Sequence, residues 1–162
     1  MFRWRRPAKA TQDHGGRVAG FEIDGRILFE VMAWWEHMGA WGTSGHIVEV
    51  SATALDADIG QALLVALRAS RQATVITDAS GPKFLLAKAG VKSAASLQRK
   101  SRRVSVGRSP EGLVQLSPTT AEGSGWVGAA PEDSIHLEDP SAEELGAALR
   151  LAMSQCRLGE ET

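Results

Sequence analysis

The sequence predicts an α+β fold, in which a mixed, largely antiparallel sheet of about six strands is packed by three or four helices. Short stretches with alternating apolar residues outnumber the stretches with helical periodicity. Turn signals separate several of these alternating stretches, which predicts hairpins. Two helical segments, each preceded by a short alternating stretch, repeat nearly the same pattern. We therefore expect two similar strand–helix units.

The first predicted elements are two strands joined by a tight turn in "VAGFEIDGRILFEVMAW", residues 18–34. Asp24-Gly25 between alternating apolar runs is a strong signal for a two-residue hairpin turn. The Trp- and Gly-rich stretch that follows, "WEHMGAWGTSG" at residues 35–45, is expected to be a loop. "HIVEVS", residues 46–51, alternates again and predicts a further strand.

The two similar helices are predicted in "LDADIGQALLVALRASR", residues 55–71, and "SAEELGAALRLAMSQCR", residues 141–157. Each has one apolar stripe at helical spacing. Gly60 and Gly146 occupy the same place in the two stripes, and glycine inside a helix costs roughly 1 kcal/mol relative to alanine. We expect that each glycine lets its helix approach the sheet closely, although amphipathic helices can also resemble one another by chance.

Capping residues are predicted at the start of both helices. Asp56 can cap the first helix, and Ser141 with Glu144 forms a capping box at the second. Between the two helices the sequence predicts a short strand in residues 72–80, followed by further elements. These are short helices at residues 82–90 and 93–101, a hairpin at residues 102–119, and strands at residues 125–129 and 134–138.

The length of 162 residues fits one domain. Residues 1–17 are basic and without periodicity, so we expect a loose N-terminal arm followed by a single α+β domain at residues 18–158. The start lacks the apolar core of a secretory signal, and no apolar run reaches the length needed to span a bilayer. A single cysteine, Cys156, excludes an intrachain disulfide. We expect a cytoplasmic protein.

The residues that commonly carry catalysis or bind metals show no motif. The four histidines have no metal-site spacing, and Cys156 lies on the apolar stripe of its helix. The glycine-rich stretches fit neither a phosphate-binding loop nor a dinucleotide fingerprint. We therefore expect no catalytic residue, no cofactor and no metal, and a protein that is not an enzyme.

The charges are arranged in blocks along the chain. Residues 1–20, 21–70, 71–110 and 111–162 carry net charges of +4, −5, +8 and −8. Segregation of this kind can steer an oppositely charged partner. Two features favour binding: the basic run Lys92–Arg108, and the Trp34, Trp35 and Trp41 cluster, because tryptophan often anchors protein interfaces.

Several stretches of the second half occur in an order that resembles one known family. These are "KSAASLQRKSRRVSV", then "LSPT", then "GW", then "SIHLEDPSAEELGAALRLAMSQC". They resemble the immunity proteins of contact-dependent growth inhibition (CDI) systems, the CdiI-like proteins, over about residues 91–157. The resemblance implies a small cytoplasmic protein that binds and neutralises the C-terminal toxin domain of a CdiA-type exoprotein. The toxins of such systems are frequently nucleases, so the resemblance implies a nuclease as the partner. It also implies that the immunity protein itself has no catalytic residue.

The family motif does not identify the residues that contact the toxin. We therefore predict them from charge and aromatic content, in two alternative groups. One group is Glu22, Asp24, Glu30, Trp34, Trp35, Glu36 and Trp41, and the other is Glu132, Asp133, Glu138 and Asp139. A nucleic-acid-associated role remains the alternative, in which Arg99, Arg102 and Arg103 of the basic run contact phosphates.

Overall fold

Seven strands and four α-helices follow one another along the part of the chain that the computed structural model describes, residues 12–75 and 81–158. In order they are β1 (Gly16–Ile23), β2 (Arg26–Trp35), β3 (Ala40–Ser51), α1 (Asp56–Gln72), α2 (Gly81–Ala89), α3 (Ala94–Lys100), β4 (Arg102–Arg108), β5 (Leu113–Glu122), β6 (Gly125–Gly128), a 3-10 turn η1 (Pro131–Asp133), β7 (Ile135–Glu138) and α4 (Ala142–Gln155).

The strands form one antiparallel sheet in the order β3-β2-β1-β4-β5. At the far edge β5 pairs with β7 through its first half and with β6 through its second half. Both predicted strand–helix units are present, as β3–α1 and β7–α4, and their strands lie near opposite edges of the sheet. The predicted α+β class is confirmed.

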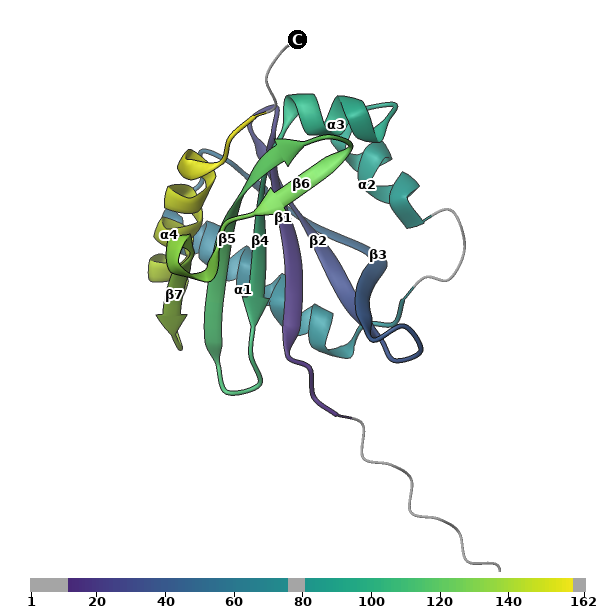
Figure 1. Ribbon diagram of the computed structural model, residues 1–162. Helices are drawn as coiled ribbons and strands as arrows, with labels where there is room; N and C mark the ends of the chain where they lie inside the picture. The colour runs from purple at the N-terminus through teal and green to yellow at the C-terminus, as the bar shows by residue number, and fades with distance from the viewer. Residues whose placement is uncertain (1–11, 76–80, 159–162) are drawn as a thin grey trace, which may run out of the picture.

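The helices lie on both faces of this sheet (Figure 1). α1 and α4 pack side by side on one face, over a core that includes Phe29, Leu63 and Leu149. α2 and α3 lie on the other face near one end, where Phe21, Leu28 and Leu97 form a second core. Alternation along β1 and β2 supplies both cores, because successive side chains of a strand point to opposite faces.

The expected loop at residues 35–45 is wrong. β2 continues to Trp35 and β3 begins at Ala40, so only residues 36–39 form the turn. Trp34 lies directly opposite Trp41 in the register, with ring centroids 5.5 Å apart in an edge-to-face arrangement. Cross-strand aromatic pairs of this kind stabilise a sheet. The two tryptophans therefore extend the strands into the stretch where the glycines had predicted a loop.

The glycines of the twin helices have a different role from the one expected. A Cβ atom on Gly60 would overlap the carbonyl oxygen of Ala142, and one on Gly146 would overlap the carbonyl oxygen of Asp56. Each glycine therefore admits the first turn of the other helix, not the sheet. The repeat in the sequence records a reciprocal crossing of α1 and α4.

One predicted cap is also wrong. Leu55 is the N-cap of α1 and no side chain caps this helix, because the Asp56 carboxylate instead accepts a hydrogen bond from Arg150 Nε at 2.6 Å. Ser141 caps α4 as predicted, accepting from the Glu144 amide at 3.2 Å.

The remaining predicted elements agree with the structure where it describes them. The Asp24-Gly25 turn, α2, α3, the β4–β5 hairpin and β6 are confirmed. Of the strand expected at residues 72–80, residues 76–80 lie outside the described part, and residues 73–75 are not a strand. β1 begins at Gly16, inside the predicted arm, and residues 1–11 are not described. Within the described residues, no helix combines the length and apolar character needed to cross a membrane.

Candidate functional site

The part of the sheet that no helix covers is the face opposite α1 and α4, at the end away from α2 and α3 (Figure 1). We call the whole face of the sheet opposite α1 and α4, including the end beside α2 and α3, the open face. The side chains that point to it come from alternate positions of the strands, and they include Arg17 on β1, Ser105 on β4 and Ser117 on β5. The positions between them, such as Val106 and Leu116, are buried under the helices. The open face is thus the polar half of strands whose other half forms the core.

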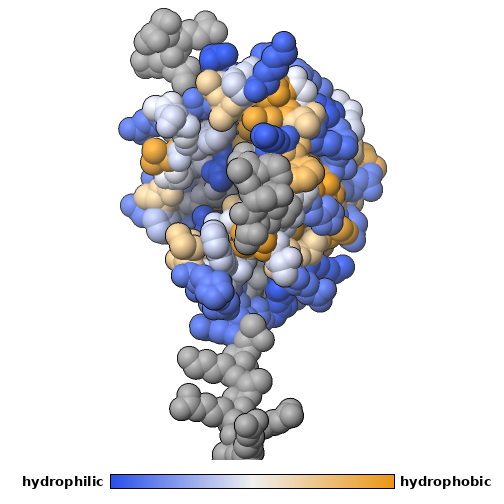
Figure 2. All heavy atoms as spheres, turned by 90° about the vertical axis from the view of Figure 1, so that its right-hand side faces the viewer, coloured by the Kyte–Doolittle hydropathy of each residue, from blue (hydrophilic) through white to orange (hydrophobic). Residues whose placement is uncertain are grey.

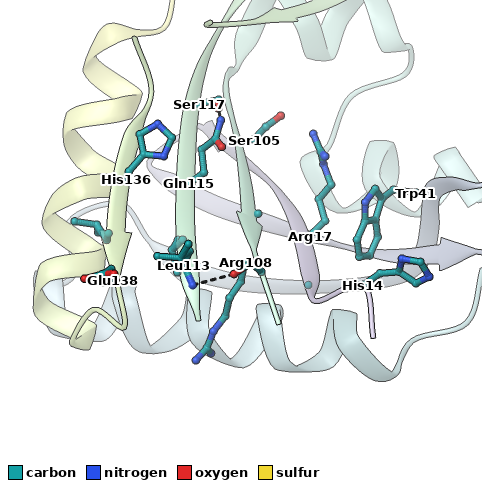
Figure 3. A pocket seen from close by; sticks show the side chains of 15 residues that line it. His14, Arg17, Trp41, Ser105, Arg108, Leu113, Gln115, Ser117, His136 and Glu138 are labelled. Atoms are coloured by element: carbon teal, nitrogen blue, oxygen red, sulfur yellow. Dashed lines mark hydrogen bonds between the residues drawn. The ribbon is translucent and has the colours of Figure 1, made fainter. Parts of the chain in front are cut away.

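Small residues make the open face hollow. Ala19, Ser105, Gly107 and Ser117 are neighbours in the register, so no large side chain rises from the middle of the sheet. A cavity of about 540 Å³ lies over this floor. Figure 3 shows His14, Arg17 and Trp41 on one side of it, and Gln115 and His136 on the other.

A second cavity, of about 330 Å³, lies next to the first, between the sheet and the helices α2 and α3. The two cavities are adjacent because Ala19, which lines the second, pairs with Ser105, which lines the first. Most of its lining is apolar, from the sheet and from both helices. The polar side chains in it are Glu30, Thr43 and Arg103.

Arg103 is held firmly in the wall of this second cavity. Its guanidinium lies 5.7 Å from the centre of the Phe21 ring and 5.5 Å from that of Trp126, and Nη1 donates a hydrogen bond to Ser105 Oγ at 3.0 Å. Cation–π contacts of this type stabilise a charged group that is partly removed from water. Burial lowers the pKa of Arg103, and the carboxylate of Glu30 opposes that shift.

Glu30 lies on β2, opposite Ala19 of β1. Arg103 lies on β4, on the other side of β1. Burial raises the pKa of the Glu30 carboxyl group, and the charge of Arg103 offsets this only in part. Among the described residues, no hydrogen bond or ion pair to the Glu30 carboxylate is formed. The open face thus presents the partly buried carboxylate of Glu30. The guanidinium of Arg103 is near it but contacts Ser105, Phe21 and Trp126.

An aromatic cluster borders the open face at the end of the β2–β3 hairpin. The His14 ring stacks on Trp34 with centroids 4.0 Å apart, and Trp34 meets Trp41 edge to face. His14 Nε2 lies 3.4 Å from a Glu36 carboxylate oxygen. The indole N–H of Trp34 is buried without a partner among the described residues.

An ion pair fixes the chain next to this aromatic cluster. Arg71, near the end of α1, donates to the carboxylate of Asp13, which also accepts from the Gly15 amide at 2.8 Å. Hydrogen bonds from Arg71 and Gly15 lower the pKa of Asp13 to about 2. His14 is thereby positioned against Trp34.

The structure brings together part of the predicted toxin-contacting set. Glu30, Trp41 and Glu138 line the two cavities of the open face, Trp34 stacks against Trp41, and Glu36 lies beside His14.

The other predicted residues lie elsewhere. By the alternation of β1 and β2, Glu22 and Trp35 point to the face of the sheet that α1 and α4 cover. Asp24 is in the turn between β1 and β2. Glu132 and Asp133 are on η1, and Asp139 follows β7 beside Arg108.

The basic run Lys92–Arg108 does not form a single stripe. Arg99 is near the end of α3, whereas Arg102 and Arg103 are successive residues of β4 and point to opposite faces of the sheet. Of the basic residues in this run, only Arg103 and Arg108 line the cavities of the open face.

Sequence reasoning missed several residues of the open face, including Arg17, Ser105, Gln115, Ser117, Trp126 and His136. Arg17 was assigned to the arm. A signal for the others exists in β4 and β5, where apolar residues alternate with serine, glycine and glutamine. That pattern indicates one uncovered face, but it does not show which strands are neighbours.

A third cavity, of about 770 Å³, lies at the outer edge of the sheet between β3 and α2. Ile47, Phe84 and Ala87 supply its apolar lining, and Phe84 is 48% exposed. Figure 2 shows this side of the molecule, where hydrophobic residues gather on the surface. In the part of the chain that the structure describes, no three His, Cys, Asp or Glu side chains are placed to hold a metal ion.

The second half of the chain is similar to one known protein family. Residues 79–156 match the model of CdiI, the CDI immunity protein. This segment is CdiI-like. The resemblance that the sequence indicated is therefore confirmed, and the matched residues comprise α2, α3, strands β4 to β7 and α4. A search of curated proteins gives no match.

Solved structures extend the likeness to almost the whole chain. A protein of unknown function from Neisseria meningitidis, NMB0488, has a TM-score of 0.69 and 19% identity, and the match covers 92% of this chain and 99% of that one. A CdiA-CT/CdiI toxin and immunity complex from Yersinia pseudotuberculosis gives a TM-score of 0.70 and 20% identity, with 89% and 98% coverage. These matches include the first half of the chain, outside the CdiI match, so that half also has the fold of the two solved structures.

Proposed function

We propose that this chain is an immunity protein that binds the C-terminal toxin domain of a CdiA-type exoprotein in the cytoplasm and neutralises it. The observation that carries the proposal is the CdiI match over residues 79–156. It is supported by the fold shared with a chain from a complex whose title names a toxin and its immunity protein. Neutralisation by binding requires no turnover, and no cofactor takes part.

The toxin docks on the open face of the sheet. This face combines a hollow, aromatic side chains and partly buried charges, which is the composition of a protein-binding site. The opposite face is filled by α1 and α4. A recess of about 550 Å³ lies beside the end of α4 and the second half of β5, but no aromatic residue lines it.

The toxin is a nuclease, and the immunity protein blocks its active or substrate-binding surface. A nuclease holds phosphates with basic groups, so a surface that inhibits it by occlusion presents acidic groups to it. Glu30 and Glu138 are the acidic side chains that line the cavities, and three arginines line them as well, so the acidic contact is local to these two residues. The charge blocks of the sequence support steering of such a basic partner.

Co-expression tests the proposal. The toxin domain encoded beside this gene is induced in a cell that also makes the full chain, and survival is counted. We expect survival with the chain and death without it, together with capture of the toxin domain by the tagged chain. Binding of the purified chain to a polyanion column at low salt, without protection from the toxin, would instead support the nucleic-acid role.

A further inference from the structure

Glu30 is a partly buried charged group of the open face, and its carboxylate forms no hydrogen bond or ion pair with the described residues. It lines the 330 Å³ cavity between β1, β2, α2 and α3, and no described residue bonds to its carboxylate. The helices contribute only apolar residues to this lining, namely Leu85, Leu86, Ala94 and Leu97. A carboxylate that is partly removed from water and unpaired costs free energy, and a fold retains it most readily where a ligand supplies the missing charge.

The neighbouring cations supply that charge only in part. Arg103 is on β4, separated from Glu30 by the whole width of β1, and its guanidinium is committed to Ser105, Phe21 and Trp126. Arg17 of β1 is exposed and forms no ion pair with Glu30. These two arginines are the charged groups that face Glu30 from the strands packed beside it.

The cavity has the dimensions and walls that suit one long basic side chain. A volume of 330 Å³ exceeds that of a single arginine or lysine side chain. The apolar helix residues can contact the methylene stem of such a side chain, while Glu30 accepts hydrogen bonds from its charged head. The neighbouring 540 Å³ hollow leaves room for the backbone that carries it.

We propose that the Glu30 cavity receives a single lysine or arginine side chain of the toxin and is the main determinant of partner specificity on the open face. This inference rests on the proposed function and adds the chemistry of the contact to it. A partner with a neutral or acidic residue at that position leaves Glu30 buried and unpaired, so it is rejected. Specificity then comes from the penalty that mismatched partners incur.

Calorimetric titration of the purified toxin domain into the full chain tests the proposal with two variants. Glu30→Gln keeps the shape of the side chain and removes its charge. Glu22→Gln is the matched control, because Glu22 is also a partly buried glutamate of the sheet but lies on the opposite face. We expect Glu30→Gln to weaken binding at least about tenfold and Glu22→Gln to change it less than about twofold.

Each outcome decides between the two proposals. Binding of the toxin by the wild-type chain with unchanged affinity of Glu30→Gln overturns the cavity proposal and leaves the immunity function in place. An equal loss in both variants also overturns it, because the effect is then one of net charge. Failure of the wild-type chain to bind the toxin refutes the immunity function, and the cavity proposal with it.

A small probe tests the cavity without the toxin. N-acetyl-arginine amide at millimolar concentration is added to the ¹⁵N-labelled chain, and the indole N–H resonance of Trp126, which lines the cavity, is followed. We expect a saturable shift in the wild-type chain and in Glu22→Gln, but none in Glu30→Gln. The same shift in all three proteins would contradict a site centred on Glu30.

Discussion

Glu30 illustrates how a single residue can oppose stability and support binding. Burial raises the pKa of its carboxyl group, so the folded chain binds the proton more tightly than the unfolded chain does. The charged form present at neutral pH therefore destabilises the fold, which loses this protonation-linked stability as the pH rises through the raised pKa. A residue that acted only in the fold would have no reason to carry this cost.

We predict that Glu30→Gln increases the free energy of unfolding at neutral pH, although it weakens toxin binding. The gain should shrink as the pH falls through the raised pKa toward the ordinary value for glutamate, because the wild-type carboxyl group then becomes neutral as well. Urea unfolding of both proteins across this pH range measures the difference. A gain that stays constant with pH would show that charge burial is not its cause.

The residues of the open face also show where the sequence stops being informative. Glu30, Trp34 and Trp41 were predicted as contacts because acidic and aromatic residues favour interfaces, and all three belong to the β2–β3 hairpin, where Trp34 and Trp41 pair. Ser105 and Gly107 give no signal by themselves, since their importance is that they are small where three strands meet. Strand order brings them together, and strand order is a property that alternation in one strand cannot predict.

At the scale of elements, the crossing of α1 and α4 explains the repeat in the sequence. Gly60 is four residues after Asp56, and Gly146 is four residues after Ala142, so each glycine lies one turn from the backbone that its partner glycine admits. Arg150 of α4 reinforces the crossing through the Asp56 carboxylate and the Ala52 carbonyl oxygen. The helical period predicted both helices. It could not show whether the glycine of each helix packs against another helix or against a sheet.

We predict that Gly60→Ala and Gly146→Ala each lower the free energy of unfolding by about 2–3 kcal/mol. Helix propensity alone predicts a gain of roughly 1 kcal/mol from the same change. The overlap with a backbone carbonyl should outweigh that gain, because the two helices must separate to relieve it. Gly128→Ala on β6, where an added Cβ meets no atom within 4 Å, is the control. Stabilisation by either helix substitution would refute the crossing.

At the scale of the whole molecule, the two faces of the sheet have different tasks. α1 and α4 close one face with the larger core, whereas α2 and α3 cover only one end of the other. The α+β class and most elements could be predicted from the sequence, because alternation and turns are local signals. The division of the sheet into a closed and an open face depends on which helices pair, and the α1–α4 contact is made by residues nearly ninety positions apart.

This division predicts that the hollow can be filled without harm to the fold. Gly107 is on β4 and faces the open side, and a Cβ added there meets no atom within 4 Å. Gly107→Phe should therefore fold with equal or greater stability, since phenylalanine favours strands, while its ring occupies the space over Ser105 and Ser117. We expect at least a hundredfold loss of toxin affinity and loss of protection in co-expression, because the ring fills the hollow that the toxin backbone would occupy.

Gly128→Phe is the matched control for this experiment, because Gly128 is likewise a strand glycine with open space around it, on β6 and outside the two cavities of the open face. It should retain wild-type affinity. If Gly107→Phe folds and still protects, the toxin does not use the open face. The cavity between β3 and α2, with its exposed Phe84, then becomes the surface to substitute, because it is the other apolar recess described beside an unpaired sheet edge.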